Sequence, residues 1–446
     1  MTIEMETSPA DAGPAGLPRL LPRVPVRSLR AHDERYGPAR LRGEALVAEV
    51  ERSGLTGRGG AAFPAGRKLR SVGERAGGRG AVVVANGMES EPASAKDAAL
   101  LARAPHLVLD GIALAAAAVG ADRACLCVGR PEQAAALSGA VAERAGRDPV
   151  AVTVTVVPSR YVASEASALV HYLNGGEAVP LFTPPRPSER GVRGRPTLVA
   201  NVETLAHIAL IGRYGADWFR SAGVAAAPGS ALVTVRGAVP SPGVYEIALG
   251  TPLRDVLALA GLAGAGVGGG AGRPAGAGPQ AILTGGYFGT WLAARDAMDV
   301  PASAPGMRAA RASFGAGVVL AFPAGGCGLA ETARIVRYLA AQSAGQCGPC
   351  MHGLPEIAAG LEQVAFRAAT RRALHALREL FGLVEGRGAC QLPDGAVRLA
   401  ASALRVFADD LRRHERGPCA GADGRSAFQV PDGAGPVHPA YAQARR

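Results

Sequence analysis

The chain has 446 residues, enough for about three domains of ordinary size and a large buried core. Apolar residues make up 48% and charged residues 19%, which is globular composition and excludes wholesale disorder. The net charge is +11, but the basic residues are dispersed and aromatic residues make up only 4%, so we expect no nucleic-acid binding.

The seven cysteines are too sparse for a disulfide framework, so we expect reduced thiols. The N-terminal segment lacks the basic and apolar regions of a secretory signal. The charge-free stretch 256–272 contains too many glycines and breaks for a membrane span. These features predict a cytoplasmic protein that is not itself transmembrane.

Apolar runs and helical patterns alternate through the first half of the chain. Residues 1–40 are rich in Pro and Arg and predict a flexible lead-in. The alternation then predicts a parallel sheet with covering helices, an α/β domain over 41–228. Its expected elements are a helix over 44–52, a glycine-rich loop running into a helix over 54–70, and strands over 81–86, 124–129 and 150–158 with helices over 97–121 and 131–147 between them.

The second half changes pattern twice. Two short strands around a Pro/Gly turn, followed by a helix, predict a β-grasp module over 229–310, with a loop at the Gly/Ala run 261–278 and a strand over 281–286. Apolar residues then recur at spacings of three and four, which predicts a helical bundle over 311–416. Gly and Pro return over 417–446, which predicts a loose tail.

The segment GRGGAAFPAGRK (57–68) combines closely spaced glycines with two basic residues. Glycines let backbone N–H groups approach a phosphate, and the N-terminus of the following helix favours an anion. An ordinary turn is the alternative, because no strand directly precedes the loop and its spacing is not that of a Rossmann fingerprint. The only lysines of the chain are Lys68 and Lys96, which hints at positions where a guanidinium does not fit.

The segment ANGMESEPASAKD (85–97) follows a predicted buried strand, where the carboxyl end of a parallel strand opens onto a ligand crevice. Glu89 and Glu91 could accept hydrogen bonds from ribose hydroxyls or a nicotinamide amide; solvated loop acids are the alternative. Two later segments place polar side chains before predicted helices, namely Glu165 in 160–173 and the group Asn201, Glu203 and Thr204 in 194–208.

A CxxC pair, Cys347 and Cys350, is followed 40 residues later by Cys390. Two thiolates at that spacing can bind one metal centre, with a distant third cysteine closing the site. A thioredoxin-like dithiol, without its βαβ context, and inert thiols are the alternatives. Cys125 and Cys127 alternate on a predicted strand and are expected in the core.

In this order the segments resemble the flavin- and NADH-binding 51-kDa (F) subunit of respiratory complex I and the related diaphorase subunits of NAD-linked hydrogenases and formate dehydrogenases. The resemblance runs from about Gly54 to about His414. It covers the glycine loop, the NADESEP-type acidic loop, AYICGEET-type and PTxVNNVETL-type segments, an SLBB-like module and an SCGxCxPC motif with a late cysteine. It implies FMN and NADH in the α/β domain and a 4Fe-4S cluster in the helical bundle.

The resemblance also implies which residues bind these groups. Phe63 would stack on a ring, and no side chain is assigned as catalytic, because the hydride chemistry belongs to the cofactors. The implied metal ligands are Cys347, Cys350 and Cys390. The implied cofactor-binding residues are Gly57, Arg58, Gly59, Gly60, Phe63, Lys68, Asn86, Glu89, Glu165, Asn201 and Thr204.

Four positions depart from the family pattern. Met88 replaces an Asp, Ala166 a Glu, Ala200 an Asn, and Ala344 the first cluster cysteine. Cys327 is the favoured replacement ligand, although a helix of about fifteen residues would put it about 20 Å away. His352, Cys419 and a three-iron or labile cluster are the alternatives.

The resemblance implies an NADH oxidoreductase subunit of diaphorase type. It would pass electrons from NADH through FMN to a 4Fe-4S cluster and on to a ferredoxin-like or membrane-bound acceptor subunit, in the cytoplasm or peripherally at the inner face of the membrane. The four departures favour an alternative, a catalytically degenerate paralogue that serves as an iron–sulfur relay or assembly module without NADH oxidation.

Overall fold

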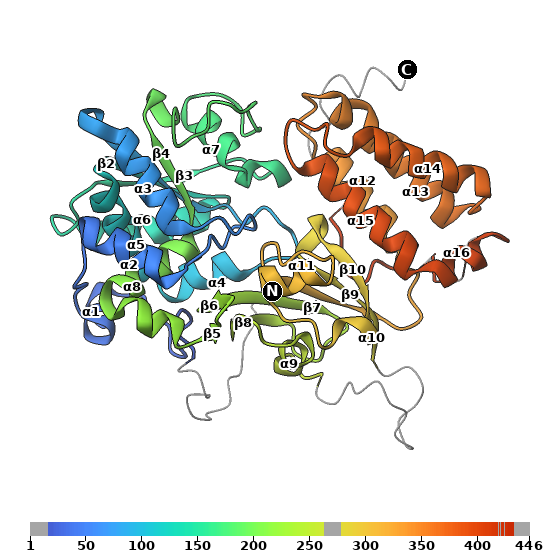
Figure 1. Ribbon diagram of the computed structural model, residues 1–446, viewed down its shortest axis with the longest axis horizontal. Helices are drawn as coiled ribbons and strands as arrows, with labels where there is room; N and C mark the ends of the chain where they lie inside the picture. The colour runs from blue at the N-terminus through green and yellow to red at the C-terminus, as the bar shows by residue number, and fades with distance from the viewer. Residues whose placement is uncertain (1–16, 263–277, 418, 420, 423, 432–446) are drawn as a thin grey trace.

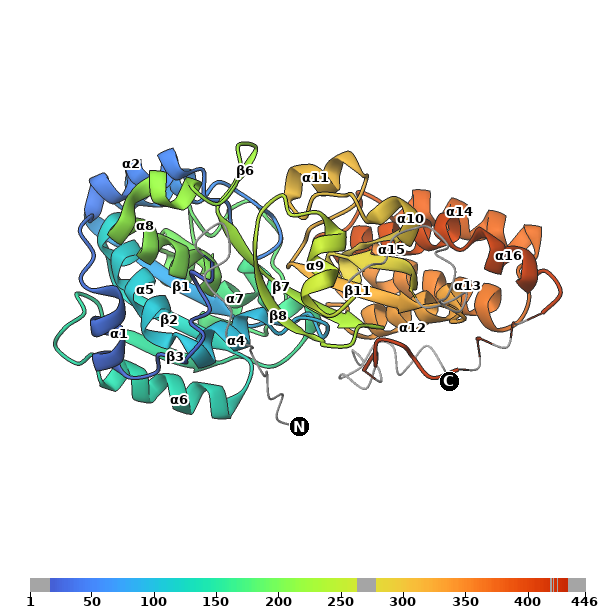
Figure 2. The ribbon, with the colours of Figure 1, turned by 90° about the horizontal axis from the view of Figure 1, so that it is seen from below.

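The computed structural model describes residues 17–262, 278–417, 419, 421–422 and 424–431. Figure 1 shows an α/β domain on one side, a helical bundle on the other and a second sheet between them. Figure 2, seen from below, shows the same order along the long axis of the molecule.

The α/β domain contains a four-stranded parallel sheet of order β3-β2-β1-β4, as the sequence predicts. Alternate residues of β1 enter two different cores, Val83 on one face and Val82 and Val84 on the other. Both faces are covered, so the strand is apolar throughout. The strands are β1 (Ala81–Gly87), β2 (Ala121–Val128), β3 (Val152–Val156) and β4 (Thr197–Asn201).

Helices on one face of this sheet form the larger core, and α7 (Ala166–Leu173) packs on the other. The larger set comprises α2 (Gly43–Ser53), α3 (Ala65–Ala76), α5 (Pro105–Val119), α6 (Pro131–Ala142) and α8 (Val202–Arg220). The carboxyl ends of β1 and β4 lie side by side, with Asn86 opposite Asn201. This is the edge at which open parallel sheets bind ligands.

The helix expected over 97–121 is two helices, α4 (Lys96–Arg103) and α5, bent by 96°. Ala104, between them, has a φ of −144° outside the helical range, and Pro105 begins the second helix, because proline interrupts a helix but suits its first turn. No single helix of the described residues is long and apolar enough to cross a membrane; only this bent pair passes on combined length and composition.

The second sheet has the order β10-β9-β11-β7-β8. Its strands are β7 (Ser230–Gly237), β8 (Gly243–Ala248), β9 (Pro279–Thr284), β10 (Thr290–Ala293) and β11 (Val318–Pro323). β11 is the central strand, parallel to β7 and antiparallel to β9, so the expected domain boundary at 310 is wrong. The short helices α9 (Leu253–Leu259), α10 (Ala294–Ala297) and α11 (Ala304–Ala309) lie beside it, and most of the expected loop 261–278 falls outside the described residues.

The C-terminal helices confirm the expected bundle and cover the other face of the second sheet. They are α12 (Gly328–Ala341), α13 (Leu354–Phe366), α14 (Arg371–Val384), α15 (Leu392–Val406) and α16 (Ala408–His414). Trp291 of β10 and Phe322 of β11 enter the same core as these helices. A small hairpin, β5 (Gly223–Val224) and β6 (Ala227–Pro228), precedes the second sheet.

The described parts of both ends pack on the fold, contrary to the sequence prediction. In the expected flexible lead-in, Leu20 is fully buried, and residues 29–36 form α1 (Leu29–Tyr36). In the expected loose tail, the backbone N–H of Phe428 donates to Glu331 at 2.9 Å, and its ring stacks on Trp291. Buried side chains and polar anchors offset the loop-forming composition of these segments.

Candidate cofactor-binding site

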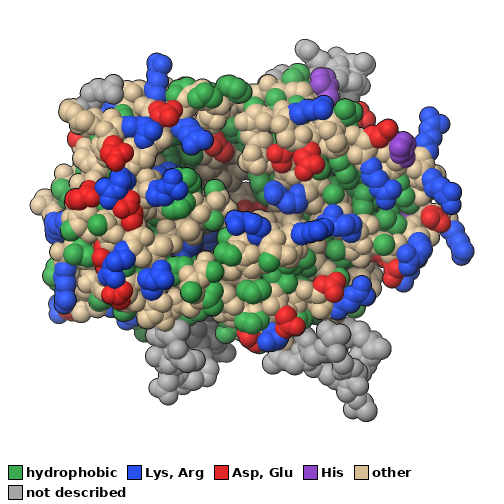
Figure 3. Space-filling model, viewed as in Figure 1, with side chains coloured by type: hydrophobic (Ala, Val, Ile, Leu, Met, Phe, Trp, Pro, Cys, Tyr) green, Lys and Arg blue, Asp and Glu red, His purple; other side chains and the backbone are tan. Residues whose placement is uncertain are grey.

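A cavity of about 670 Å³ opens at the carboxyl ends of β1 and β4, a volume typical of a cofactor site. Figure 3 shows the hollow in the middle of the face, between the α/β domain and the bundle. All eleven residues implied as cofactor-binding line this one cavity. They are Gly57, Arg58, Gly59, Gly60, Phe63, Lys68, Asn86, Glu89, Glu165, Asn201 and Thr204.

The glycine loop is closed by its own backbone and tied to α8. The N–H of Gly57 donates to the Phe63 carbonyl at 2.8 Å, and Gly60 has a φ of 106°, which favours glycine. The N–H of Arg58 donates to Thr204 Oγ1 at 2.9 Å. Phe63 remains 48% exposed, a large fraction for an aromatic ring on a cavity wall. Its ring is therefore available for stacking.

Lys68 follows the loop on α3 and brings a cation to the cavity wall. Its Nζ donates to the Val199 carbonyl at 2.5 Å. Burial lowers the pKa of Lys68, and Glu165 partly opposes that effect. Within the described chain no carboxylate forms an ion pair with Lys68. A phosphate beside the glycine loop would supply the missing negative charge.

The acidic loop is half-buried, so the solvated-acid alternative is wrong. The Glu89 carboxylate accepts hydrogen bonds from the N–H groups of Asp97 at 2.9 Å and Ala98 at 3.0 Å, and thereby caps α4. Glu91 accepts from the Tyr161 hydroxyl at 2.6 Å and the Tyr287 N–H at 2.8 Å. Burial raises the pKa of both carboxyls. The loop is held rigidly at the cavity edge.

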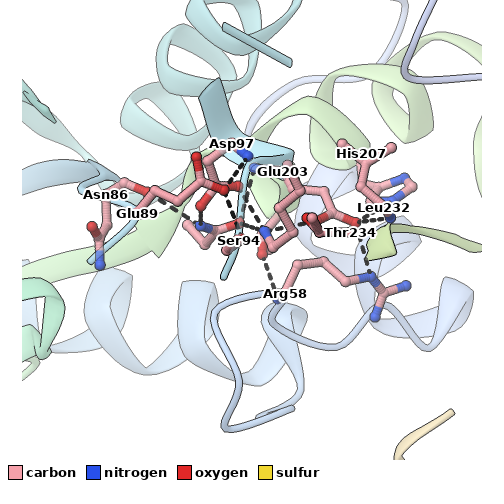
Figure 4. Close-up of polar contacts among 12 residues, drawn as sticks. Arg58, Asn86, Glu89, Ser94, Asp97, Glu203, His207, Leu232 and Thr234 are labelled. Carbon is pink, nitrogen blue, oxygen red and sulfur yellow. Dashed lines mark hydrogen bonds and ion pairs between the residues drawn. The ribbon is translucent and has the colours of Figure 1, made fainter. Parts of the chain in front are cut away.

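A buried network of charges lies behind the acidic loop, as Figure 4 shows. Lys96 is 2% exposed, and its Nζ lies 2.6 Å from Asp97 Oδ1 and 2.9 Å from Glu203 Oε2. Burial opposes the charge of Lys96, but the two carboxylates outweigh it and raise the pKa. The Nε of Arg58 lies 3.8 Å from Glu203 Oε1. Within this network the opposite charges pair with one another rather than with a ligand.

Arg58 and Lys96 are placed differently from what the motifs predict. The Arg58 guanidinium points into the protein, where NH2 donates to the Ser230 carbonyl at 3.1 Å. Mainly the backbone of Arg58 therefore lines the cavity. Lys96 and Asp97 line the cavity, although the motifs do not assign them to it. The rarity of lysine in this chain is the available signal, and both lysines do lie at the site.

Three other polar side chains of the wall organise the backbone around them. Asn201 is the N-cap of α8 and accepts from the Glu203 N–H at 3.0 Å; Glu165 is the N-cap of α7 and accepts from the Ser167 N–H at 2.8 Å. Asn86 donates to the Ser164 carbonyl at 2.8 Å. Ser, Thr, Asp and Asn are the usual N-capping residues, so the capping role of Glu165 depends on the conformation of the loop before α7.

The departures from the family pattern do not block the cavity. Met88 is 3% exposed and packs in the core with Val84 and Cys127, away from the cavity wall. Ala166 and Ala200 lie on the wall. Small side chains there remove polar contacts and leave space.

Cys347, Cys350 and Cys390 gather where α13 and α15 begin. The Cys350 thiol interacts with the thiols of both other residues. Cys350 lies in the π-helical turn Pro349–Gly353, and Cys390 comes two residues before α15. Cys390 also lines the nucleotide cavity. Thiols are the donors that iron–sulfur clusters prefer, so these three residues fit a cluster in which one iron has no cysteine ligand.

The structure does not supply Cys327 as a fourth ligand. Ala344, at the position of the missing cysteine, is 5% exposed, and Cys327 begins the far end of α12, a helix of 14 residues. Such a helix is about 20 Å long. Cys327 and Cys419 instead lie together with His414. The prediction that Cys327 completes the cluster site is therefore wrong, and His352 is exposed.

A nucleotide-sized cavity at a parallel-sheet edge, with one cysteine of a three-thiol set on its wall, is the arrangement of a flavin- and iron–sulfur-dependent oxidoreductase component. Family models match in the corresponding order: the Nuo51 FMN-binding domain over 50–210, the SLBB domain over 232–267 and the NADH-ubiquinone oxidoreductase-F iron-sulfur binding region over 330–414. The chain is 31% identical over 389 residues to the F subunit of the NADH-quinone oxidoreductase of Streptomyces coelicolor, covering 83% of each chain.

Other relatives agree. The chain is 31% identical over 409 residues to the F subunit of the NADH-quinone oxidoreductase of Mycobacterium tuberculosis, with 87% of this chain and 88% of the relative covered. A solved NAD+-reducing [NiFe]-hydrogenase in the H2-reduced state superposes with a TM-score of 0.75 at 30% identity, over 89% of this chain and 65% of that chain. The chain belongs to the family of NADH-quinone oxidoreductase F subunits and is an NADH oxidoreductase with FMN and a 4Fe-4S cluster as cofactors.

Proposed function

We propose that this chain binds NADH and FMN in the cavity and passes the electrons of NADH to a cluster that Cys347, Cys350 and Cys390 would hold, and from there to an acceptor subunit. The observation that carries the proposal is that Cys390 and the glycine loop line one cavity. Bound FMN accepts a hydride from NADH and gives up electrons singly, as a one-electron cluster requires. A thiol on the cavity wall keeps the path between the two sites short.

The chain's own residues bind and orient the nucleotides. The backbone of Gly59 and Gly60 and the ammonium of Lys68 hold phosphate, and the exposed face of Phe63 stacks on a ring. Asn86, Glu89, Glu165, Asn201 and Thr204 form the polar wall against which the rings and riboses lie. Their hydrogen bonds to the backbone hold this wall in one geometry before ligand arrives.

Aromatic side chains cover the cavity towards the bundle. Tyr161 and Phe288 both line the wall, and their ring centroids are 4.8 Å apart. Tyr161 is itself fixed by Glu91 at 2.6 Å. We assign this pair the role of excluding water between the nucleotide cavity and the thiol site.

The acceptor is a ferredoxin-like or membrane-bound subunit of the same complex, and the chain works peripherally on the cytoplasmic side. Relatives with subunit names support a multisubunit assembly. Met351, next to Cys350, is 40% exposed, and Leu383 of α14 is 59% exposed. The neighbour of Leu383, Val384, packs against the turn that contains Cys350. Exposed apolar side chains beside a thiol site suit a docking partner.

An anaerobic optical spectrum of the purified holoprotein, before and after NADH, tests the proposal. We expect flavin absorption to bleach on adding NADH and the cluster to become reduced. Acid treatment of the same sample should release FMN. Protein that neither contains FMN nor takes it up would overturn the proposal, and a cluster without measurable NADH binding by calorimetry would instead support the relay alternative.

A further inference from the structure

A second group of soft metal ligands lies outside the cavity. Cys327 is the N-cap of α12, His414 is the last residue of α16, and Cys419 follows in the C-terminal segment. One ligand atom from each residue lies within 4.8 Å of the other two. Cys327 is 3% exposed and His414 is fully buried. Two distant parts of the sequence, the beginning of α12 and the end of α16 with the residues after it, therefore converge on one small volume.

The spacing of the atoms matches a tetrahedral site. Cys327 Sγ lies 3.5 Å from His414 Nε2. A zinc ion with Zn–S of about 2.3 Å and Zn–N of about 2.0 Å would hold these two atoms about 3.5 Å apart. Cys327 and His414 need little movement to bind it, and the thiol of Cys419 lies within 4.8 Å of both ligand atoms.

The imidazole is oriented as in a metal site. His414 Nδ1 lies 3.0 Å from the Val364 carbonyl oxygen, which can only accept. Nδ1 therefore carries the proton, and the lone pair of Nε2 faces Cys327 Sγ and the backbone N–H of Cys419, which donates to it at 3.4 Å. A backbone carbonyl on the far nitrogen is the usual partner of a metal-bound histidine.

We propose that Cys327, His414 and Cys419 bind a divalent zinc-class ion, separate from the cluster, with water as the fourth ligand. On binding, the two thiols lose their protons to solvent, and the resulting thiolates neutralise the charge of the ion. A neutral set of this kind can be buried, whereas an unpaired ion cannot. The proposal is independent of nucleotide binding.

The site joins the end of the chain to the junction between β11 and α12. A side chain on Gly421 would approach the Gly325 carbonyl to 2.9 Å, so the segment after Cys419 packs directly on the loop before Cys327. The same segment continues to Phe428, which is bound to Glu331 of α12. We assign the ion a structural role, holding this segment against the bundle.

Elemental analysis of the full-length holoprotein, purified without a metal-affinity column, tests the site. We expect about one zinc per chain beside the cluster iron, as in a structural site. Cys419→Ser and Cys327→Ser should lose the zinc and keep flavin and iron. Cys125→Ser, a cysteine on β2 away from both sites, is the matched control and should keep all three.

A second measurement keeps the test independent of whether the variants fold. Chelator-treated wild-type protein is titrated with Co²⁺, and tetrahedral thiolate coordination should give visible d–d bands that Zn²⁺ abolishes. Wild-type protein with no zinc and no cobalt bands overturns the proposal and leaves a thiol–imidazole hydrogen bond. An intact mass showing a Cys327–Cys419 disulfide overturns it too, as does equal zinc loss from the Cys125→Ser control.

Discussion

Two parts of the cavity wall use their charges differently. Behind the acidic loop, Lys96 is enclosed by Asp97 and Glu203, and its charge is satisfied within the protein. At the glycine loop, the one hydrogen bond of the Lys68 ammonium among the described residues goes to a carbonyl, and Phe63 has an exposed ring. The first region holds the fold and the second is prepared for a ligand. Substitutions should therefore separate into those that unfold the chain and those that only release nucleotide.

The largest effect is expected from Lys96→Met. It leaves Asp97 and Glu203 buried without their cation, which typically costs about 3–5 kcal/mol. Denaturant unfolding followed by circular dichroism measures the loss. Arg30→Met breaks an exposed pair with Glu34 and should change stability by less than about 1 kcal/mol. Equal losses of stability in Lys96→Met and Arg30→Met would contradict the claim that the Lys96 region holds the fold.

A cluster of buried ion pairs away from the cavity provides a second test of the difference between structural and ligand-binding charges. Asp110 of α5 contacts His32 of α1 at 2.7 Å and Arg144 at 2.6 Å, and also Arg213. Burial opposes its ionisation, but His32 and the two arginines outweigh it and hold the pKa of Asp110 well below its usual range. Because the pKa of Asp110 is lower in the folded than in the unfolded state, its ionised carboxyl stabilises the fold above about pH 4. This contribution to stability is lost as the pH falls through the pKa of the folded state.

Asp110→Asn should therefore destabilise the protein at neutral pH and flatten the fall in stability below about pH 4. Thermal unfolding at a series of pH values measures this slope. Asp122→Asn, on an exposed side chain, is the control. NADH affinity should be unchanged, since Asp110 does not line the cavity. A loss of affinity in the folded variant would argue against separate regions.

Lys68→Met should release ligand without unfolding the chain. A hydrogen bond to a charged group contributes about 1.5–3 kcal/mol, so flavin or NADH binding should weaken by about 10- to 100-fold. Calorimetric titration of the flavin-depleted protein gives both affinities. The neighbouring exposed Arg67, which is not on the cavity wall, provides a matched Arg67→Met control. Unaltered affinities in Lys68→Met would exclude a phosphate role.

Phe63→Ala should have the smallest binding effect of the set. Stacking of a base on an aromatic ring contributes about 1–3 kcal/mol, and the ring is already half exposed, so a loss near the lower end is expected. The readout is the dissociation constant of NADH, with Phe182→Ala as the control, since Phe182 is 77% exposed and does not line the cavity. Equal dissociation constants for Phe63→Ala and wild type would remove the stacking role.

The sequence predicted the parallel sheet, and the residues that it assigned to cofactor binding line one cavity, because both depend on local patterns. Apolar runs marked β1 and β2, and the motif residues that follow β1 and β4 meet at one edge. The break at Pro105 and the placement of β11 in the second sheet were missed. The first depends on one φ angle, and the second on a strand pairing more than 80 residues apart in sequence.

The thiol chemistry was only partly predictable. The CxxC spacing and Cys390 identified one set of thiols, whereas the position of Cys327 depends on how α12 and α16 pack. The positions of the Arg58 and Lys96 side chains also depend on packing and could not be predicted from the motifs. Motif position suggested that Arg58 faces a nucleotide, but only the packing shows that its guanidinium donates to Ser230 and Thr56.

Because Cys390 belongs both to the thiol set and to the cavity wall, maturation of the two centres is expected to be linked. Without the cluster, the Cys390 thiol on the wall would lack its metal bond, so binding of the cluster and binding of FMN should affect each other.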